Sequence, residues 1–136
     1  YQSAMAAAGL PAEIVTLPLP GNARAGSSGE ARAAILRDWL SQRNRPDGVV
    51  TYSAWTAEPL LYAAAQLGMG VPDDLSVTTI EDEPALHLGR LVTTVVLDVE
   101  KLAAVAVEML RCKITAPTES LSVQKIVPHL VRGDTA

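Results

Sequence analysis

The segment GMGVPDDLSVTTIED, residues 68–82, constrains the fold more than any other part of the chain. Its first glycine is typical of a helix end, its Val-Pro-Asp-Asp of a turn, and residues 75–80 of a buried strand. After an acidic loop, residues 92–97 predict a second strand, and Asp98 is placed to cap a long amphipathic helix that stops before Pro117. Strands that alternate with helices favour right-handed βαβ units and a mostly parallel sheet.

The rest of the chain continues this alternation. Pro59 is compatible with a helix only in its first turn, so its helix is expected to have its N-cap near Thr56. A capping box of Ser27 and Glu30 predicts the start of another helix. We also expect helices over residues 1–8 and 84–88 and strands over residues 14–19, 49–52, 123–127 and 130–131. The predicted class is α/β, with three layers (α/β/α) and on the order of five strands.

The composition is that of a globular domain with no membrane or nucleic-acid role of its own. The chain has 136 residues, 49% of them hydrophobic, and no apolar run or leader pattern long enough for a membrane span or signal peptide. The formal net charge is -4 and no Lys/Arg stripe is present, so the chain is not expected to neutralise DNA phosphates. Cys112 is the single cysteine, which excludes an internal disulfide. We expect a cytoplasmic domain without a cofactor.

No pattern of catalytic or metal-binding residues stands out in the sequence. His87 and His129 are far apart and lack a serine or cysteine in a motif context, which disfavours a catalytic triad. The GSSG at residues 26–29 lacks the lysine of a phosphate-binding loop, and the acidic run at residues 81–83 lacks the ligand spacing of a Ca²⁺ or Mg²⁺ site. We therefore predict a protein that is not an enzyme and that holds no metal.

Three loops follow the predicted strands at the edge where α/β proteins bind ligands. In open sheets, ligands lie outside the carboxyl ends of the strands, where helix N-termini direct N–H groups at the site. The loops are residues 21–28, 53–55 and 81–84. The sequence predicts a binding site where they converge.

Five stretches spread over nearly the whole chain form a pattern together. They are PDGV at residues 46–49, GxxVPDDLSV at 68–77, the acidic pair at 81–82, TTV followed by Asp98-Val99 at 93–99, and PxLVxGDTA at 128–136. In this order they resemble the effector-binding half of bacterial transcription regulators of the lactose-repressor and galactose-repressor (LacI/GalR) family. The resemblance implies a periplasmic-binding-protein-like type I fold, in which two α/β subdomains enclose the effector.

The resemblance also implies a domain organisation. Residues 1–90 would belong to the C-terminal subdomain, residues 91–116 would cross to an N-terminal subdomain, and residues 117–136 would return. Most of the N-terminal subdomain and the DNA-binding headpiece would lie outside this chain, which looks like a fragment. The apolar face of the crossing helix would then lack its native partner here.

The resemblance places effector contacts in the same three loops, but with different side chains. Ser53 and Ala54 stand where the family usually has an asparagine-aspartate pair. Glu81 stands where it places a sugar-binding aspartate, and Arg24 stands about where the lactose repressor carries a stacking tryptophan. Trp55 is either a replacement platform for a sugar or a packing residue. These departures favour a different or larger ligand, for instance one with an anionic group for Arg24.

By this resemblance, the chain is the ligand-sensing and dimerisation part of a LacI-type regulator that binds a sugar-like molecule. It would reach DNA only through the headpiece, and the effector would act by shifting an equilibrium between subdomain arrangements. Homodimer contacts are implied on residues 58–67 and 84–88. The candidate interface residues are Leu61, Tyr62, Leu86 and Leu88.

Two other functions share this fold. A solute-binding protein of a sugar ABC transporter has the same cleft, and the residues before Tyr1 distinguish it, because a signal peptide indicates a transporter and a helix-turn-helix a regulator. A doubly wound enzyme acting on a phosphorylated substrate would need a glycine-rich phosphate loop or a base-nucleophile pair, and the sequence shows neither.

Overall fold

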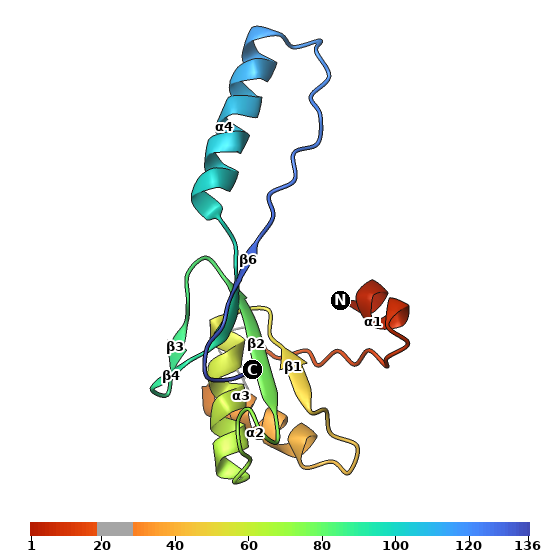
Figure 1. Cartoon of the computed structure of the whole chain (residues 1–136), viewed down its shortest axis with the longest axis vertical. Helices are drawn as coiled ribbons and strands as arrows, with labels where there is room; N and C mark the ends of the chain where they lie inside the picture. Colours follow the sequence, from red (N-terminus) through yellow and green to blue (C-terminus); the bar gives the residue numbers. More distant parts are fainter. Residues whose placement is uncertain (19–28) are drawn as a thin grey trace.

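A computed structural model describes residues 1–18 and 29–136. The main sheet of these residues has the order β1-β2-β5-β6 (Figure 1). Its strands are β1 (Gly48–Val50), β2 (Ser76–Glu81), β5 (Thr93–Val96) and β6 (His129–Val131). The first three are parallel and β6 pairs antiparallel with β5, so the predicted α/β class with a mostly parallel sheet is confirmed.

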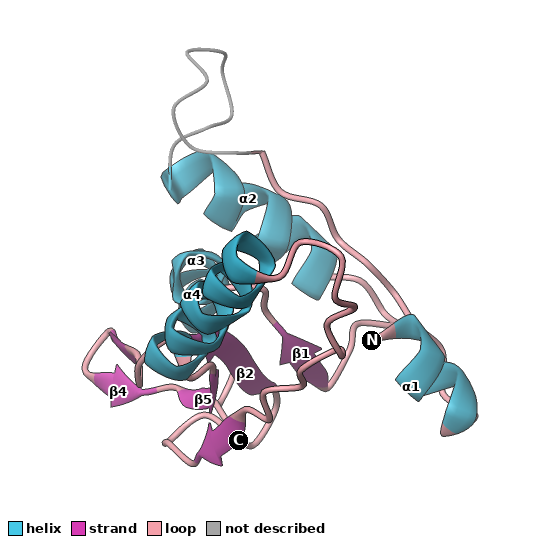
Figure 2. Cartoon of the chain, turned by 90° about the horizontal axis from the view of Figure 1, so that it is seen from above, coloured by secondary structure: helices cyan, strands magenta, loops and turns pink. Residues whose placement is uncertain are grey.

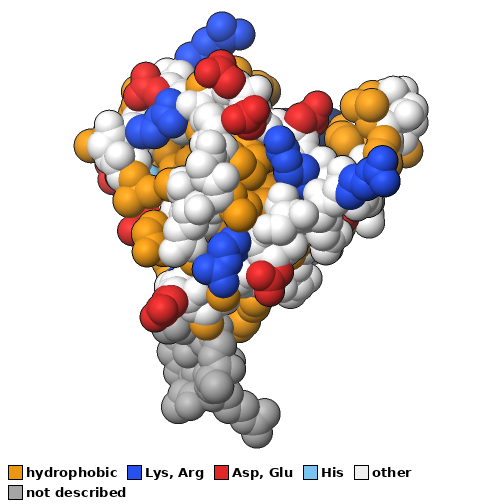
Figure 3. Space-filling view, turned by 90° about the horizontal axis from the view of Figure 1, so that it is seen from below, with side chains coloured by type: hydrophobic (Ala, Val, Ile, Leu, Met, Phe, Trp, Pro, Cys, Tyr) orange, Lys and Arg blue, Asp and Glu red, His pale blue; other side chains and the backbone are white. Residues whose placement is uncertain are grey.

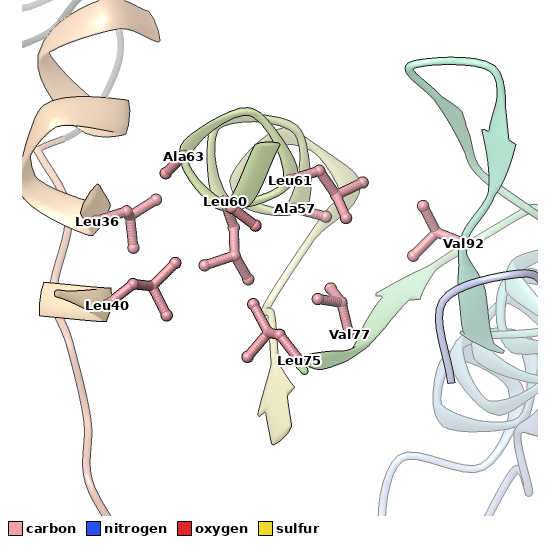
Figure 4. Packing of buried hydrophobic residues seen from close by; sticks show 10 residues of the cluster. Leu36, Leu40, Ala57, Leu60, Leu61, Ala63, Leu75, Val77 and Val92 are labelled. Atoms are coloured by element: carbon pink, nitrogen blue, oxygen red, sulfur yellow. The ribbon is translucent and has the colours of Figure 1, made fainter. Parts of the chain in front are cut away.

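Two helices pack on one face of this sheet and form the core with it. α2 (Gly29–Leu40) and α3 (Ala54–Gln66) lie side by side over the strands (Figure 2). Figure 4 shows the apolar side chains of both helices directed toward one another and toward β2. The core cluster that they form with the sheet contains the buried side chains of Leu36, Leu40, Leu60, Leu75 and Val77. The sequence predicts three layers, with helices on both faces; within residues 1–18 and 29–136, helices pack on this one face.

The other two helices stand apart. Within the described ranges, neither α1 (Gln2–Ala7) nor α4 (Val99–Thr115) contacts another helix or strand. α4 projects away from the sheet, and residues 117–128 return beside it (Figure 1). The Lys101 N–H donates to Asp98 Oδ1 at 2.9 Å, which confirms the predicted cap. No residue of α4 is buried, and its exposed apolar side chains include Leu102, Val107, Leu110 and Ile114.

α3 begins about one turn earlier than the position of Pro59 in the sequence predicts. Its N-cap is Ser53, not Thr56, so Pro59 lies inside the helix. The Ser53 N–H donates to Thr56 Oγ1 at 3.3 Å, and the Thr56 hydroxyl donates back to Ser53 O at 2.7 Å. These two bonds close the first turn of α3, and Pro59 leaves the helix one backbone N–H donor short.

A β-hairpin replaces the short helix expected over residues 84–88. β3 (Leu86–His87) pairs antiparallel with β4 (Arg90–Leu91). The two residues between them, Leu88 and Gly89, have φ values of 50° and 73°. Positive φ at both central residues is the geometry of a type I′ hairpin turn, which no right-handed helix can contain.

Two expected strands are absent from the described residues. Residues 14–18 form no strand; Leu17 packs against the core, and the neighbouring Glu13 Oε1 accepts from Trp39 Nε1 at 2.7 Å, so α2 and not a sheet neighbour holds this stretch. Residues 123–127 also form none, and Val123 and Val127 are 85% and 82% exposed beside α4. By contrast, the strand expected at residues 130–131 forms within β6.

Near the end of the chain, Thr135 forms hydrogen bonds with two strands of the sheet. The Val77 N–H donates to Thr135 O at 2.7 Å, and the Thr135 hydroxyl donates to Val77 O at 2.7 Å. The same hydroxyl accepts from the Thr93 N–H at 2.9 Å. Thr135 is 0% exposed, so it joins β2 and β5 through bonds that are shielded from water.

Candidate functional site

The candidate site lies at the carboxyl edge of the parallel strands, where α3 and α4 begin. β1 leads through Ser53 into α3, and β5 leads through Asp98 into α4. The ends of β2 and β5 are held together, since the Leu97 N–H donates to Glu81 O at 2.8 Å. The two described loops predicted to bind a ligand therefore share one edge of the sheet.

Glu81 connects these two loops directly. Its side-chain Oε1 accepts from the Ala54 N–H at 2.5 Å, and Ala54 is the first residue of α3. Glu81 is half-buried. Its carboxylate accepts from one of the backbone N–H groups that have no partner within the helix at its N-terminus. The structure thus brings Ser53 and Glu81 together, although 27 residues separate Ala54 from Glu81 in the sequence. One oxygen of Glu81 positions the loop, and the carboxylate has a second acceptor oxygen.

Trp55 lies under an arginine that the sequence analysis does not single out. The Arg32 guanidinium carbon is 4.0 Å from the centroid of the Trp55 ring, which is a cation–π contact. Arg32 is 7% exposed. Its signal in the sequence is its spacing, because Arg32, Leu36 and Leu40 recur every four residues along the buried face of α2. Arg32 thus covers one face of the Trp55 ring, and the role of Trp55 as a platform for a sugar stays a prediction.

Arg24 lies outside the described residues, as does the whole loop at residues 21–28, including Ser27 of the predicted capping box. Arg24 therefore stays a prediction from the sequence.

The four interface candidates divide into two groups. Leu61 is 4% exposed and belongs to the core, so it is not available to a partner, and its assignment to an interface is corrected. Tyr62, Leu86 and Leu88 are 47%, 69% and 56% exposed. β3 contacts α3, so the hairpin lies beside this helix.

The ionisable groups of α4 lie away from this edge. Arg111 donates to the Glu108 carboxylate at 2.9 Å and 3.0 Å on the solvent-exposed helix surface. These hydrogen bonds and the charge of the guanidinium hold the pKa of Glu108 below its ordinary value and raise the pKa of Arg111. Residues 1–18 and 29–136 contain no cluster of three or more His, Cys, Asp or Glu side chains arranged to hold a metal ion.

The family of the chain is established by its full-length match. Residues 1–136 match the periplasmic binding protein-like domain, and the chain belongs to this family. It is 30% identical over 103 residues to the HTH-type transcriptional repressor PurR of Edwardsiella ictaluri (strain 93-146). That alignment covers 75% of this chain and 30% of the repressor, so the chain spans under a third of that relative's length.

Solved structures of LacI-family regulators share the fold. A LacI family transcriptional regulator from Arthrobacter sp. FB24, in complex with lactose, has a TM-score of 0.76 at 19% identity and is matched over 98% of this chain and 48% of its own. The CelR–cellobiose complex has a TM-score of 0.74 at 21% identity, covering 100% of this chain and 40% of its own. These likenesses confirm the predicted periplasmic-binding-protein-like fold. Among the described residues, no helix is both long and apolar enough to cross a bilayer.

Proposed function

We propose that the chain is the ligand-sensing and dimerisation part of a LacI-type transcription regulator. The observation that carries this proposal is the hydrogen bond from the Ala54 N–H to Glu81, because it joins two predicted effector loops at one sheet edge. The similarity to PurR and to regulators solved with lactose and cellobiose supports the same function. The protein would act by binding and not by catalysis, in the cytoplasm where its operator lies.

We propose a small, sugar-like molecule as the effector. The contacts would come from Ser53, Glu81 and Trp55, together with Arg24 in the loop outside the described residues. Hydroxyl and carboxylate groups bind sugar hydroxyls, and an indole edge or face packs on the apolar side of a sugar ring. The proposed contacts therefore match the chemistry of a sugar.

The domain organisation predicted from the sequence is proposed in the same sense. Residues 1–90 would form the C-terminal subdomain, residues 91–116 the crossing segment and residues 117–136 the return. The projection of α4 from the sheet supports this division, as does the apolar surface that α4 leaves exposed (Figure 1). In the dimer, DNA would be bound by the two headpieces. Closure of a second subdomain over the sheet edge would change the distance between these headpieces on an operator.

Calorimetric titration of the intact protein with lactose, cellobiose and related sugars tests the proposal. We expect at least one sugar to bind, and Ser53→Ala and Trp55→Ala to weaken its affinity by about tenfold, the equivalent of one lost hydrogen bond or ring contact. Ser122→Ala removes the same hydroxyl from an exposed position beside α4 and serves as the matched control. If no sugar binds at millimolar concentration, the protein is not a sugar-sensing regulator.

A further inference from the structure

An arginine of α2 and a tryptophan of α3 join the first turns of these two helices. Arg32 is the fourth residue of α2, Trp55 is the second residue of α3, and 4.0 Å separate the guanidinium carbon from the centroid of the indole ring. The guanidinium lies next to the start of α2, since a Cβ added at Gly29 would be 3.8 Å from Arg32 Nη2. Arg32 is 7% exposed, so the contact with the ring is largely shielded from water, which strengthens its electrostatic attraction.

The backbone of α3 holds Trp55 less firmly than a regular helix would. In an α-helix, the N–H of each residue donates to the C=O group four residues earlier. The residue four positions after Trp55 is Pro59, which has no N–H, so the C=O group of Trp55 lacks this donor. The contact with Arg32 therefore restrains Trp55 at a position where the helix itself has one hydrogen bond fewer.

The contact also limits how the ring of Trp55 can be oriented. An indole side chain turns about two bonds, and a planar guanidinium stacks on one of its faces. Trp55 is half-buried, so its solvent-exposed part lies away from the face that Arg32 covers. The preceding residue, Ala54, donates its N–H to Glu81 at the edge where the effector loops meet. The orientation of the ring is thus fixed within a predicted effector loop.

A second arginine of α2 connects the same two helices at another place. Arg37 Nη1 donates to Gln66 Oε1 at 3.4 Å, and Gln66 is the last residue of α3. Both arginines therefore join α2 to α3, but they do so at opposite ends of α3. Only the contact of Arg32 involves a residue that is predicted to touch the effector.

We infer that Arg32 is a positioning residue, which holds the ring of Trp55 in the orientation in which a ligand packs on it. The inference rests on the proposed function, in which Trp55 contacts a sugar. The role requires the planar guanidinium, because a lysine keeps the positive charge but is a compact ammonium that cannot stack flat on the ring. Arg32 acts on the affinity for the ligand through Trp55.

Calorimetric titration of the intact protein with lactose and cellobiose measures this effect. Arg32→Met keeps an unbranched side chain but removes the charge and the plane, and we expect it to weaken the binding of the sugar about tenfold, as Trp55→Ala does. Arg32→Lys keeps the charge alone, and we expect a loss of about threefold. Arg37→Met is the identical substitution at the far end of α3, and its affinity should stay within about twofold of the wild type.

A double-mutant cycle separates positioning from direct contact with the ligand. Arg32→Met in a Trp55→Ala background should change the affinity by no more than about twofold, because the ring that Arg32 positions is then absent. If Arg32 bound the sugar itself, the two losses would multiply to about a hundredfold. If Arg32→Met does not fold, as shown by far-UV circular dichroism, Arg32→Lys takes its place in the cycle.

The ring gives a second measurement, which a general loss of packing does not reproduce. The intact protein is labelled with 5-fluorotryptophan, and Trp55→Phe assigns the fluorine resonance of Trp55. We expect this resonance to shift when sugar is added to the wild type and to shift in sugar-free Arg32→Met. In Arg37→Met, it should keep its wild-type position.

Three results would overturn the inference while leaving the proposed function intact. The first is a sugar affinity that both substitutions of Arg32 leave unchanged. The second is an equal loss of affinity in Arg32→Met and Arg37→Met, and the third is a loss from Arg32→Met that is as large in the Trp55→Ala background as in the wild type. If neither sugar binds to the wild type, the proposed function fails and the inference fails with it.

Discussion

At the scale of single residues, the buried hydroxyl of Thr135 stabilises the sheet by pairing with two backbone groups. Its hydroxyl donates to Val77 O and accepts from the Thr93 N–H, so Thr135→Val keeps the shape but leaves both backbone groups without a partner. We expect the free energy of unfolding of the intact protein to fall by about 2–3 kcal/mol in urea titrations. Thr118→Val, at an exposed position, should stay within about 0.5 kcal/mol, and equal losses in both variants would contradict this role.

Gly133 is required for a different reason, namely the space around its Cα. A Cβ added there would lie 2.1 Å from Leu91 O and 2.6 Å from Leu91 C, which are backbone atoms that cannot rotate away. We expect Gly133→Ala to lower the thermal midpoint and to cost about 2 kcal/mol or more, as overpacking does. Gly48→Ala is the control, because a Cβ at Gly48 meets no atom within 4 Å. A thermal midpoint that is unchanged in Gly133→Ala would show that the last residues do not pack as described.

At the scale of elements, α3 and α4 have opposite relations to the core. Leu60 of α3 is 1% exposed, whereas Leu110 of α4 is 61% exposed. The same substitution therefore separates them: Leu60→Ala should cost about 2–5 kcal/mol of unfolding free energy in this chain, and Leu110→Ala within about 0.5 kcal/mol. Urea unfolding of the 136-residue chain measures both values. A large loss for Leu110→Ala would mean that α4 packs on the sheet after all.

The sequence predicts those elements whose determinants are local. The cap of α4 is a contact between Asp98 and Lys101, three residues apart, and the alternation of apolar residues suffices for the parallel strands. The hairpin is different, because its strands form only when Leu86 faces Leu91, and a proline at residue 84 suits a helix start equally well. Residues 14–18 have strand composition but pair with no neighbour in the described structure.

The candidate site shows the same limit. Its loops follow from strand order alone, and Ser53 and Glu81 do share an edge. The bond to Ala54 spans 27 residues, and the position of Arg32 over Trp55 depends on how α2 packs on α3. Neither contact has a sequence spacing that predicts it. The contacts that shape the candidate site are thus tertiary, whereas its location follows from the order of the strands.

At the scale of the whole molecule, the surface charge agrees with the proposed function, in which DNA would be reached through another domain. The net charge is -4, and the end of the molecule seen in Figure 3 has acidic and basic side chains interspersed, with no stripe of one sign on that face. Such a face offers no row of cations to match the phosphates of a duplex. Exposed apolar surface is instead a feature of α4 and of the hairpin, where protein partners are expected.

The hairpin surface leads to a prediction about assembly. Tyr62, Leu86 and Leu88 are exposed apolar or aromatic side chains on α3 and on the hairpin beside it. An isologous dimer through the hairpin would place Leu86 of both subunits within the same interface. Leu86→Glu would then bring two like charges into an apolar interface, which weakens association strongly. We expect the intact wild-type protein to be a dimer at micromolar concentration and Leu86→Glu to be a monomer, as measured by size exclusion with light scattering.

The control for this prediction is Leu67→Glu, a residue that is 37% exposed at the end of α3 and that points to another side of the helix than Tyr62. It adds the same charge at a different exposed position of α3, so a dimer in Leu67→Glu and a monomer in Leu86→Glu would assign the interface to the hairpin. A monomeric wild-type protein would exclude a dimer through this surface. A dimer in both variants would move the interface elsewhere, with α4 as the next apolar surface to substitute.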